Sequence, residues 1–300
     1  MSASVPLPAD LVRRLTGRSP DHGVDGDTWL RRLPGLVQDR LDAWDLRVTG
    51  PATNGHNALV LPVERDGEPL VLKISWPHRE ADHEHVGLRH WGGRGIVRLV
   101  AAHPAAHALL LESLRPGHDL HGVEATEACE VIGGLLRRLH VAPPATVPAF
   151  ADAVTHRIAP LRDRPRTVPR RWAERALEIF DHRPYEPRLL HLDLHYGNVL
   201  AASREPWLAI DPQPVAGPAG FDVHAALRNR VEEYGTGAGL RWMVRHRLEV
   251  VADTAGIDLD DARSWSIAHA VLDAHEFAEE GWPTLTSLNL TIAKALDDPV

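Results

Sequence analysis

The sequence predicts an α+β fold in two lobes, a small antiparallel-sheet lobe followed by a larger, mainly helical one. Short apolar segments separated by polar turns fill most of residues 1–113, after a helical lead-in. Apolar residues at helical spacing dominate residues 114–300, and a compact β-like segment interrupts them. We therefore expect the lobe boundary after residue 113, with a hinge near residues 112–117.

Helical pieces are expected over residues 9–43, broken by Gly23, Gly26 and Pro34. The polar turns that follow separate five short strands, at residues 46–48, 58–63, 70–74, 97–100 and 108–112. One helix, residues 79–91, follows the third strand and ends at a run of glycines. The first lobe is therefore predicted to be a small sheet with one inserted helix.

The second lobe begins with a predicted helix over residues 126–140, which two prolines stop. Residues 149–168 are rich in proline and arginine and are interpreted as a connection. A helix over residues 170–182 leads to the β-like segment, residues 189–211. Helical patterns then fill the rest of the chain, with breaks near residues 235–239, 256 and 281–283.

The composition is that of an ordinary globular protein with an acidic balance. The 41 acidic and 33 basic side chains give a formal charge of −8, so we expect no nucleic-acid partner. This balance is compatible with a cationic substrate and equally with a solvated acidic surface. Cys129 is the single cysteine, which excludes an internal disulfide. Because neither a signal-like start nor a membrane-length apolar run is present, we expect a cytoplasmic protein without a membrane partner.

The segment HLDLHYGNVL contains H-x-D-x-x-x-x-N, the spacing of a kinase catalytic loop. In such a loop a carboxylate, here Asp193, accepts a hydrogen bond from the attacking hydroxyl group. The neutral amide of Asn198 can ligate magnesium without adding charge, and Asp211, at the end of an apolar strand, can reach the other side of the metal. Each residue alone could be a turn or cap residue. Their order, with a strand between them, favours a kinase site that uses ATP and Mg²⁺.

Lys73 lies in the apolar strand VLKI, close to the V-A-I-K pattern of kinases. Only two of the 33 basic residues are lysines, and arginine is a poor substitute where a compact charge is needed. We expect Lys73 to contact the phosphates of ATP, with Glu84 on the following helix holding it. Glu80, one turn earlier, is the competing partner. The alternative is a strand-edge lysine whose head group reaches water.

Two further segments of the first lobe are weaker candidates for contacts with ATP. The turn around Asn54, residues 53–57, could cover the phosphates with backbone N–H groups, or it could be a plain hairpin turn. The strand that ends near Glu112 could run into a hinge whose backbone binds adenine, or it could be an ordinary buried strand.

His191, Asp193 and His195 alternate and would share one face of an extended segment. This spacing raises a second hypothesis, a metal-dependent hydrolase with histidine and aspartate ligands. That hypothesis leaves the lysine, its glutamate and the asparagine without roles, and chance pairs are expected among 19 histidines. We therefore interpret the two histidines as residues that brace the loop.

The later segments HLDLHYGNVL, WLAIDPQP and GPAGFD resemble the aminoglycoside phosphotransferase superfamily. The earlier segments GPATNGHNALVLPV, VLKISWPHREADHE, VRLVAAH and LLLESLRPG are similar to one subgroup, the aminoglycoside/hydroxyurea resistance kinases that include streptomycin 6-phosphotransferases. These segments follow the order of the family over residues 50–222.

The resemblance implies a bilobal, protein-kinase-like fold and transfer of phosphate from ATP to an alcohol, with Mg²⁺ as cofactor. It implies that Asp193 is the catalytic aspartate and that Asn198 and Asp211 are the metal ligands. It also implies that Lys73 and Glu84 form the pair that anchors the phosphates.

Three positions depart from the pattern of the family. Leu192 stands where the loop usually has glycine, Gln213 replaces the usual lysine of DPKP, and Pro218 replaces the aspartate of G-D-P. Asp222, which follows in the same segment, is retained. We still expect phosphoryl transfer with these changes, and they bear mainly on the identity of the substrate.

A streptomycin-like substrate carries guanidinium groups, so acidic residues should line its pocket. Asp273, Glu276 and Glu280 fall on one face of a predicted helix and are candidates for this role, although a charged face is more often merely solvated. Two alternatives stay open: a kinase of another metabolite or secondary product, and a nucleotide-binding pseudokinase. A pseudokinase is expected to lack the lysine or a metal ligand, and this sequence retains all of them.

Overall fold

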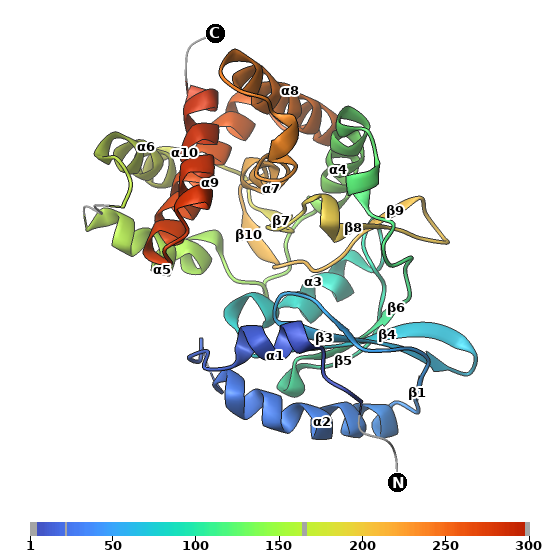
Figure 1. Ribbon diagram of the computed structural model, residues 1–300. Helices are drawn as coiled ribbons and strands as arrows, with labels where there is room; N and C mark the ends of the chain where they lie inside the picture. Colours follow the sequence, from blue (N-terminus) through green and yellow to red (C-terminus); the bar gives the residue numbers. More distant parts are fainter. Residues whose placement is uncertain (1–4, 22, 164–166, 298–300) are drawn as a thin grey trace. The chain divides into compact units, whose positions relative to one another are not determined.

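The computed structural model describes residues 5–21, 23–163 and 167–297. The chain forms two compact units, Met1–Arg115 and Pro116–Val300 (Figure 1). In the described residues, the first unit contains a sheet and three α-helices, and the second is mostly helical with two small two-stranded antiparallel sheets. The predicted α+β class is therefore confirmed.

The sheet of the first unit has six strands in the order β1-β3-β4-β6-β5, with β2 paired to β3. All of these pairs are antiparallel. The strands are β1 Arg47–Val48, β2 Thr53–Asn54, β3 Ala58–Arg65, β4 Glu68–Ser75, β5 Leu99–His103 and β6 Ala108–Glu112. The hairpin between β3 and β4 turns at Asp66 and Gly67, both at positive φ, which suits the right-handed twist of the strands.

Helices α1, Ala9–Leu15, and α2, Gly26–Ala43, cover one face of this sheet. The predicted break at Gly23 and Gly26 is confirmed, because α1 ends before it and α2 begins at Gly26, but the predicted break at Pro34 is wrong, because Pro34 lies inside α2. Pro34 is exposed. The opposite side of the helix carries buried residues every fourth position, and their packing on the sheet outweighs the local cost of proline; they are Trp29, Leu33, Val37 and Leu41.

Helix α3, Glu84–Trp91, covers the opposite face of the sheet. Leu72 and Ile74 of β4 point into the core under α1 and α2, so Lys73 between them points the other way, where it meets Glu84 of α3. The predicted helix over residues 79–91 is shorter than expected, since Arg79–Ala81 form a separate 3₁₀ turn. The helix ends at Gly92, which has left-handed φ.

The second unit is built around α9, whose residues are buried over most of its length. Helices α5, α6, α8 and α10 pack against α9, and α4 packs against α8. The predicted breaks near residues 235–239, 256 and 281–283 fall at the ends of these helices and are confirmed. The helices are α4 Ala125–Leu139, α5 Phe150–Arg162, α6 Arg170–His182, α7 His224–Leu227, α8 Ala238–Ala255, α9 Leu259–Glu279 and α10 Pro283–Asp297.

The interpretation of residues 149–168 as a connection is wrong, because α5 occupies most of this segment. Its buried residues, Phe150, Val154, Ile158 and Leu161, are spaced by three or four and form one face. Phe150 packs edge-on against Phe221, with ring centroids 4.8 Å apart. The proline and arginine content concealed a helix that tertiary packing stabilises; residues 164–166 lie outside the described part of the chain.

Two small antiparallel pairs frame the segment between α6 and α7. Strand β7, Arg188–Leu190, pairs with β10, Val215–Gly217, and β8, Val199–Ala201, pairs with β9, Trp207–Ala209. The β-like character of this segment is confirmed, although β10 was not predicted. In the described part of the chain, no helix combines the length and the apolarity that crossing a membrane requires.

Candidate active site

The predicted catalytic loop connects β7 to β8. Because β7 and β8 pair with β10 and β9, the segment around Asp211 returns to the loop. The backbone N–H of Ile210 donates to the carbonyl of Asn198 at 2.9 Å, and that of Gln213 donates to the carbonyl of His191 at 2.9 Å. Asp211 therefore lies between two residues that are hydrogen-bonded to the loop, and its own φ of 60° is left-handed.

Asp193 is held from two sides. The side-chain amide of Asn198 donates to the backbone carbonyl of Asp193 at 2.8 Å and to its Oδ2 at 3.1 Å. The guanidinium group of Arg228 donates to Oδ1 of Asp193 at 2.6 Å. The two loop residues proposed from the sequence are thus in direct contact, and an arginine that the sequence analysis did not single out joins them.

Asp222 holds the backbone of the loop. It is 1% exposed, and its carboxylate accepts hydrogen bonds from the N–H groups of His191 at 2.9 Å and Leu192 at 2.6 Å. His140 Nε2 lies 2.9 Å from the same carboxylate. Burial acts to raise the pKa of Asp222, but the bonds from His140 and the loop outweigh it, and the pKa is lowered below its usual value.

Leu192 has a φ of 65°, in the left-handed region that favours glycine. This geometry gives a physical reason for the glycine that the loop usually carries at this position. The carboxylate of Asp222 holds the amide of Leu192 in place. Of the other two departures, Gln213 bonds to the loop through its backbone, and Pro218 precedes the 3₁₀ turn Ala219–Val223.

The two histidines of the loop brace it, as the sequence analysis expected. His191 is fully buried, and burial lowers its pKa, so the ring is neutral. Its Nε2 bonds to the carbonyl of Ile210 at 3.0 Å, and its Nδ1 accepts from the N–H of Asp193 at 3.4 Å. His195 Nδ1 accepts from the N–H of Gly197 at 3.1 Å. Among the described residues, no three His, Cys, Asp or Glu side chains gather in a group able to hold a metal, so the hydrolase hypothesis has no ligand set there.

Lys73 and Glu84 form a close ion pair in the first unit. The ammonium group of Lys73 donates to both carboxylate oxygens of Glu84, at 2.7 and 2.8 Å, and the two side chains are 11% and 5% exposed. The competing partner, Glu80, lies instead near His78, at 3.9 Å. The pair is positioned by the sheet and by α3, so the lysine is not a strand-edge residue that reaches water.

The two weaker candidates of the first unit take part in local hydrogen bonds. Asn54 lies in β2, opposite Leu59, and its amide donates to the carbonyl of Gly55 at 3.0 Å. Glu112 ends β6, and its carboxylate accepts from the N–H of Arg98 at 2.6 Å. These contacts shape the turn and the strand end where the sequence analysis expected nucleotide contacts.

The three acidic residues proposed for the substrate pocket lie in different environments. Asp273 is 3% exposed and accepts hydrogen bonds from Arg157 at 2.8 Å and Arg228 at 2.9 Å. Glu276 also accepts from Arg157, at 2.5 and 2.6 Å, whereas Glu280 is exposed at the end of α9. A substrate could reach the Asp273 carboxylate only if one of its arginines moved away.

The sequence analysis did not identify Arg157 or Arg228 as site residues, although both bind carboxylates of predicted site residues. Arg228 lies 35 residues from Asp193 along the chain, and no local motif links the two. Arg157 lies on α5, in the segment that was interpreted as a connection. A helical period in that segment was the one signal that could have drawn attention to Arg157.

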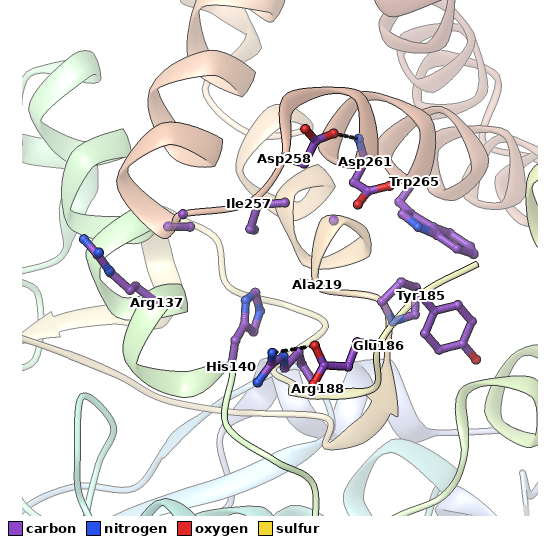
Figure 2. Close-up of a pocket in the computed structure, with 14 residues that line it drawn as sticks. Arg137, His140, Tyr185, Glu186, Arg188, Ala219, Ile257, Asp258, Asp261 and Trp265 are labelled. Carbon is purple, nitrogen blue, oxygen red and sulfur yellow. Dashed lines mark hydrogen bonds and ion pairs between the residues drawn. The ribbon is translucent and has the colours of Figure 1, made fainter. Parts of the chain in front are cut away.

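A cavity of about 440 Å³ lies elsewhere in the second unit, at the ends of α4, α8 and the start of α9 (Figure 2). Its lining includes His140, Arg137, Asp258 and Trp265, and none of the site residues predicted from the sequence. His140 connects this cavity to Asp222 and so to the loop backbone. Because none of the predicted site residues lines it, this cavity is not the site of the predicted chemistry.

Comparisons with known proteins agree with the geometry. Residues 43–281 match the family model described as aminoglycoside/hydroxyurea antibiotic resistance kinase. A streptomycin 6-kinase of Streptomyces glaucescens is 38% identical over 288 residues, covering 91% of this chain and 92% of that protein. A hydroxyurea phosphotransferase of Kitasatospora aureofaciens is 38% identical over 321 residues, covering 99% and 87%. The crystal structure of choline kinase LicA from Streptococcus pneumoniae has a TM-score of 0.60 at 10% identity, covering 88% of this chain and 99% of that one, which shows a shared fold.

Proposed function

This chain belongs to the aminoglycoside/hydroxyurea antibiotic resistance kinase family, and we propose that it transfers the γ-phosphate of ATP to a hydroxyl group of a streptomycin-like antibiotic and thereby inactivates it. The observation that carries this proposal is the contact of Asp193 with Asn198 beside Asp211, on a loop with kinase spacing. The extent of the similarity to streptomycin 6-kinases supports the choice of substrate.

The residues around the loop fit a magnesium ion. Asn198 and Asp211 offer a neutral amide oxygen and a carboxylate, and hard cations of this kind prefer oxygen ligands shared with substrate phosphates. The amide nitrogen of Asn198 already donates to Asp193, which orients the amide so that its oxygen is the available ligand atom. A bound magnesium ion would neutralise charge on the phosphates during transfer.

Lys73 would contact the α- and β-phosphates of ATP, and Glu84 would hold its ammonium group. A lysine head group that is pre-positioned by an ion pair loses little side-chain freedom when a phosphate arrives. The backbone near Asn54 and Glu112 is the proposed neighbourhood of the phosphates and of adenine. Because ATP is the phosphate donor, we place the enzyme in the cytoplasm.

Asp193 would accept a hydrogen bond from the acceptor hydroxyl and orient its oxygen for in-line attack. Phosphoryl transfer needs little covalent participation by the protein, so positioning and charge neutralisation provide most of the rate enhancement. Of the three acidic candidates, the exposed Glu280, which follows α9, is the one open to a guanidinium group of the substrate, and Asp273 acts through Arg228.

A second acceptor is hydroxyurea. The hydroxyurea phosphotransferase relative is as similar to this chain as the streptomycin 6-kinase and aligns with 99% of it. Hydroxyurea also offers a hydroxyl group, so the same chemistry would apply. A kinase of another hydroxylated metabolite uses the same residues, and a pseudokinase would bind ATP without turnover.

The test is transfer of phosphate from ATP to streptomycin, to hydroxyurea and to a panel of other hydroxyl compounds, with magnesium present. The wild type is compared with Asp193→Asn, which keeps the shape of the side chain and removes its charge. We expect phosphorylated streptomycin from the wild type and at least ~10²-fold less from the variant.

Transfer to hydroxyurea or another compound instead would keep the mechanism and replace the substrate. Bound ATP without turnover on any acceptor would favour the pseudokinase. An Asp193→Asn variant with full activity would overturn the proposed role of Asp193.

A further inference from the structure

The structure contains a line of ion pairs that starts on α5 and α9 and ends at the catalytic loop. Glu276 binds Arg157, Arg157 binds Asp273, Asp273 binds Arg228, and Arg228 binds Asp193. Arg228 uses different nitrogens for its two carboxylates: Nη1 for Asp273 at 2.9 Å and Nη2 for Asp193 at 2.6 Å. One planar guanidinium group therefore spans both carboxylates.

We propose that Arg228 is a positioning residue for phosphoryl transfer, which fixes the orientation of the Asp193 carboxylate by anchoring it to Asp273. The proposal rests on the proposed function, in that Asp193 is the residue that orients the acceptor hydroxyl. It assigns Asp273 to support of the catalytic loop rather than to direct contact with the substrate.

The need for such a residue follows from the side chain of aspartate. The torsion that rotates an aspartate carboxylate has a broad energy profile, so the side chain alone does not define where its oxygens point. In this protein Arg228 donates to Oδ1 and Asn198 donates to Oδ2. Each donor binds a different oxygen of the carboxylate. Each oxygen has a further lone pair that can accept a hydrogen bond from a substrate hydroxyl.

Asp273 is suited to be the fixed end of this contact. It lies in the middle of α9, the central helix of its unit, with 3% of its surface exposed. His269 Nε2 at 3.4 Å and His224 Nε2 at 3.5 Å also face its carboxylate. Burial alone would raise the pKa of Asp273, but His269 and Arg228 lower it well below its usual value, so Asp273 remains ionised.

Arginine is the residue that this geometry requires. Its rigid fork presents separate N–H donors at a fixed spacing, whereas lysine presents one compact ammonium group on a flexible stem. Arg228 sits directly after α7 and is a quarter exposed, so it is not a residue of the apolar core. The contact with Asp193 is therefore separable from the packing of the unit.

Arg157 provides a matched control. It also donates to Asp273, at 2.8 Å, but its second carboxylate partner is Glu276, which lies on α9 like Asp273, rather than Asp193 of the catalytic loop. Arg157→Ala and Arg228→Ala thus each remove one guanidinium group from the same buried carboxylate. Only the second also releases the carboxylate of the catalytic loop.

The experiment measures kcat and the KM for ATP and for the acceptor in the wild type, Arg228→Ala, Arg228→Lys and Arg157→Ala. We expect Arg228→Ala to lower kcat by about 100-fold and to change KM little, because orientation of the hydroxyl matters most in the transition state. Arg228→Lys should be intermediate, and added guanidinium ion should restore part of the activity of Arg228→Ala. Arg157→Ala should keep kcat within about threefold of the wild type.

Thermal denaturation of the same variants separates positioning from folding. Comparable losses of stability in Arg157→Ala and Arg228→Ala, with a loss of kcat only in the second, would support the proposal. Equal losses of kcat in both variants, or a normal kcat in Arg228→Ala, would overturn it.

A crystal structure of Arg228→Ala tests the inference without any acceptor. We expect the Asp193 carboxylate to rotate away from its contact with Asn198, and an unchanged carboxylate would overturn the proposal. If the wild type phosphorylates no acceptor, the proposed function fails while this structural result still decides the positioning role.

Discussion

At the scale of single residues, a buried carboxylate with no part in the proposed chemistry sets the shape of the catalytic loop. Asp222 accepts hydrogen bonds from two consecutive N–H groups of the loop and from His140. Backbone N–H groups that are left unpaired in a buried site are costly, so the loop keeps this conformation only while the carboxylate is present. Leu192 shows the same dependence, because its left-handed backbone is held by this carboxylate.

Replacing Asp222 with alanine is expected to lower the free energy of unfolding by about 3 kcal/mol, since it leaves charge-assisted hydrogen bonds unmade in a buried site. Urea denaturation at neutral pH measures the loss. Asp152→Ala, at an exposed position in the first turn of α5, is the control and should cost less than about 1 kcal/mol. A similar small loss for both variants would contradict the role of Asp222 as a clamp.

The same carboxylate predicts a dependence on pH. The pKa of Asp222 is lowered in the folded protein, so its stabilising contribution is present above its unfolded pKa of about 4 and is lost as the pH falls through the lower, folded value. The difference in free energy of unfolding between the wild type and Asp222→Ala should therefore be constant near neutral pH and shrink below about pH 4. A difference that stayed constant down to the acid transition would show that the charge of Asp222 is not what stabilises the loop.

Leu192 offers a test of backbone strain. At an ordinary position glycine is less stable than alanine, but at the left-handed φ of Leu192 the order should reverse. We expect Leu192→Gly to exceed Leu192→Ala in free energy of unfolding by about 1 kcal/mol, because both remove the leucine side chain and only glycine removes the strain. Chemical denaturation measures the stability of the two variants. If the alanine variant were the more stable, the inference that the Leu192 backbone is strained would be wrong.

At the scale of elements, α4 and α8 approach closely because α4 carries glycine at the contact. A Cβ atom added at Gly133 would lie 2.7 Å from Thr254 Cβ and 2.8 Å from the carbonyl oxygen of Val251, both on α8. The next residue, Gly134, has open space around the same atom. Helix propensity disfavours both glycines equally, so only packing distinguishes them.

Gly133→Ala is therefore expected to destabilise the protein by about 1–3 kcal/mol, because the two helices must separate. Gly134→Ala should stabilise it by up to about 1 kcal/mol through helix propensity alone. Thermal and urea denaturation of the two variants measure the loss of stability expected for the first and the gain expected for the second. If both substitutions stabilised the protein, the close contact of α4 with α8 would be refuted.

At the scale of the whole molecule, each of the two units carries part of the proposed chemistry. Lys73 and Glu84 are paired within the first unit, and Asp193, Asn198 and Asp211 are assembled within the second. In the proposed function, the first set contacts the phosphates of ATP and the second set holds the metal and orients the acceptor. Substitution of Lys73 in the first unit or of Asp211 in the second should therefore weaken nucleotide binding.

Magnesium and ATP together are expected to raise the melting temperature, since a ligand at 100 times its Kd stabilises a protein by about 2.7 kcal/mol. The shift should disappear when EDTA removes the metal, and it should be strongly reduced in Lys73→Met and in Asp211→Asn. Differential scanning fluorimetry measures these shifts. A full shift in both variants would contradict the proposed contacts with the phosphates and the metal.

Short-range sequence patterns were enough to predict several local features of the protein. The spacing from His191 to Asn198 predicted the loop, and the similarity of VLKI to the V-A-I-K pattern, with the helix that follows, predicted the pair of Lys73 and Glu84. These features can be predicted from the sequence because the residues involved lie within about one or two elements of each other. Helices with strong apolar periods, such as α4 and α6, were predicted nearly to their ends for the same reason.

The partners of the buried charges and the elements that packing stabilises became known from the three-dimensional structure. The pairs of Arg228 with Asp193 and of Asp273 with Arg157 join residues 35 and 116 positions apart. With 33 basic and 41 acidic side chains, sequence alone offers many possible pairs and no means of choosing among them. Likewise, α5 and the unbroken α2 exist because their apolar faces are buried against other elements, and that burial outweighs the local preferences of proline.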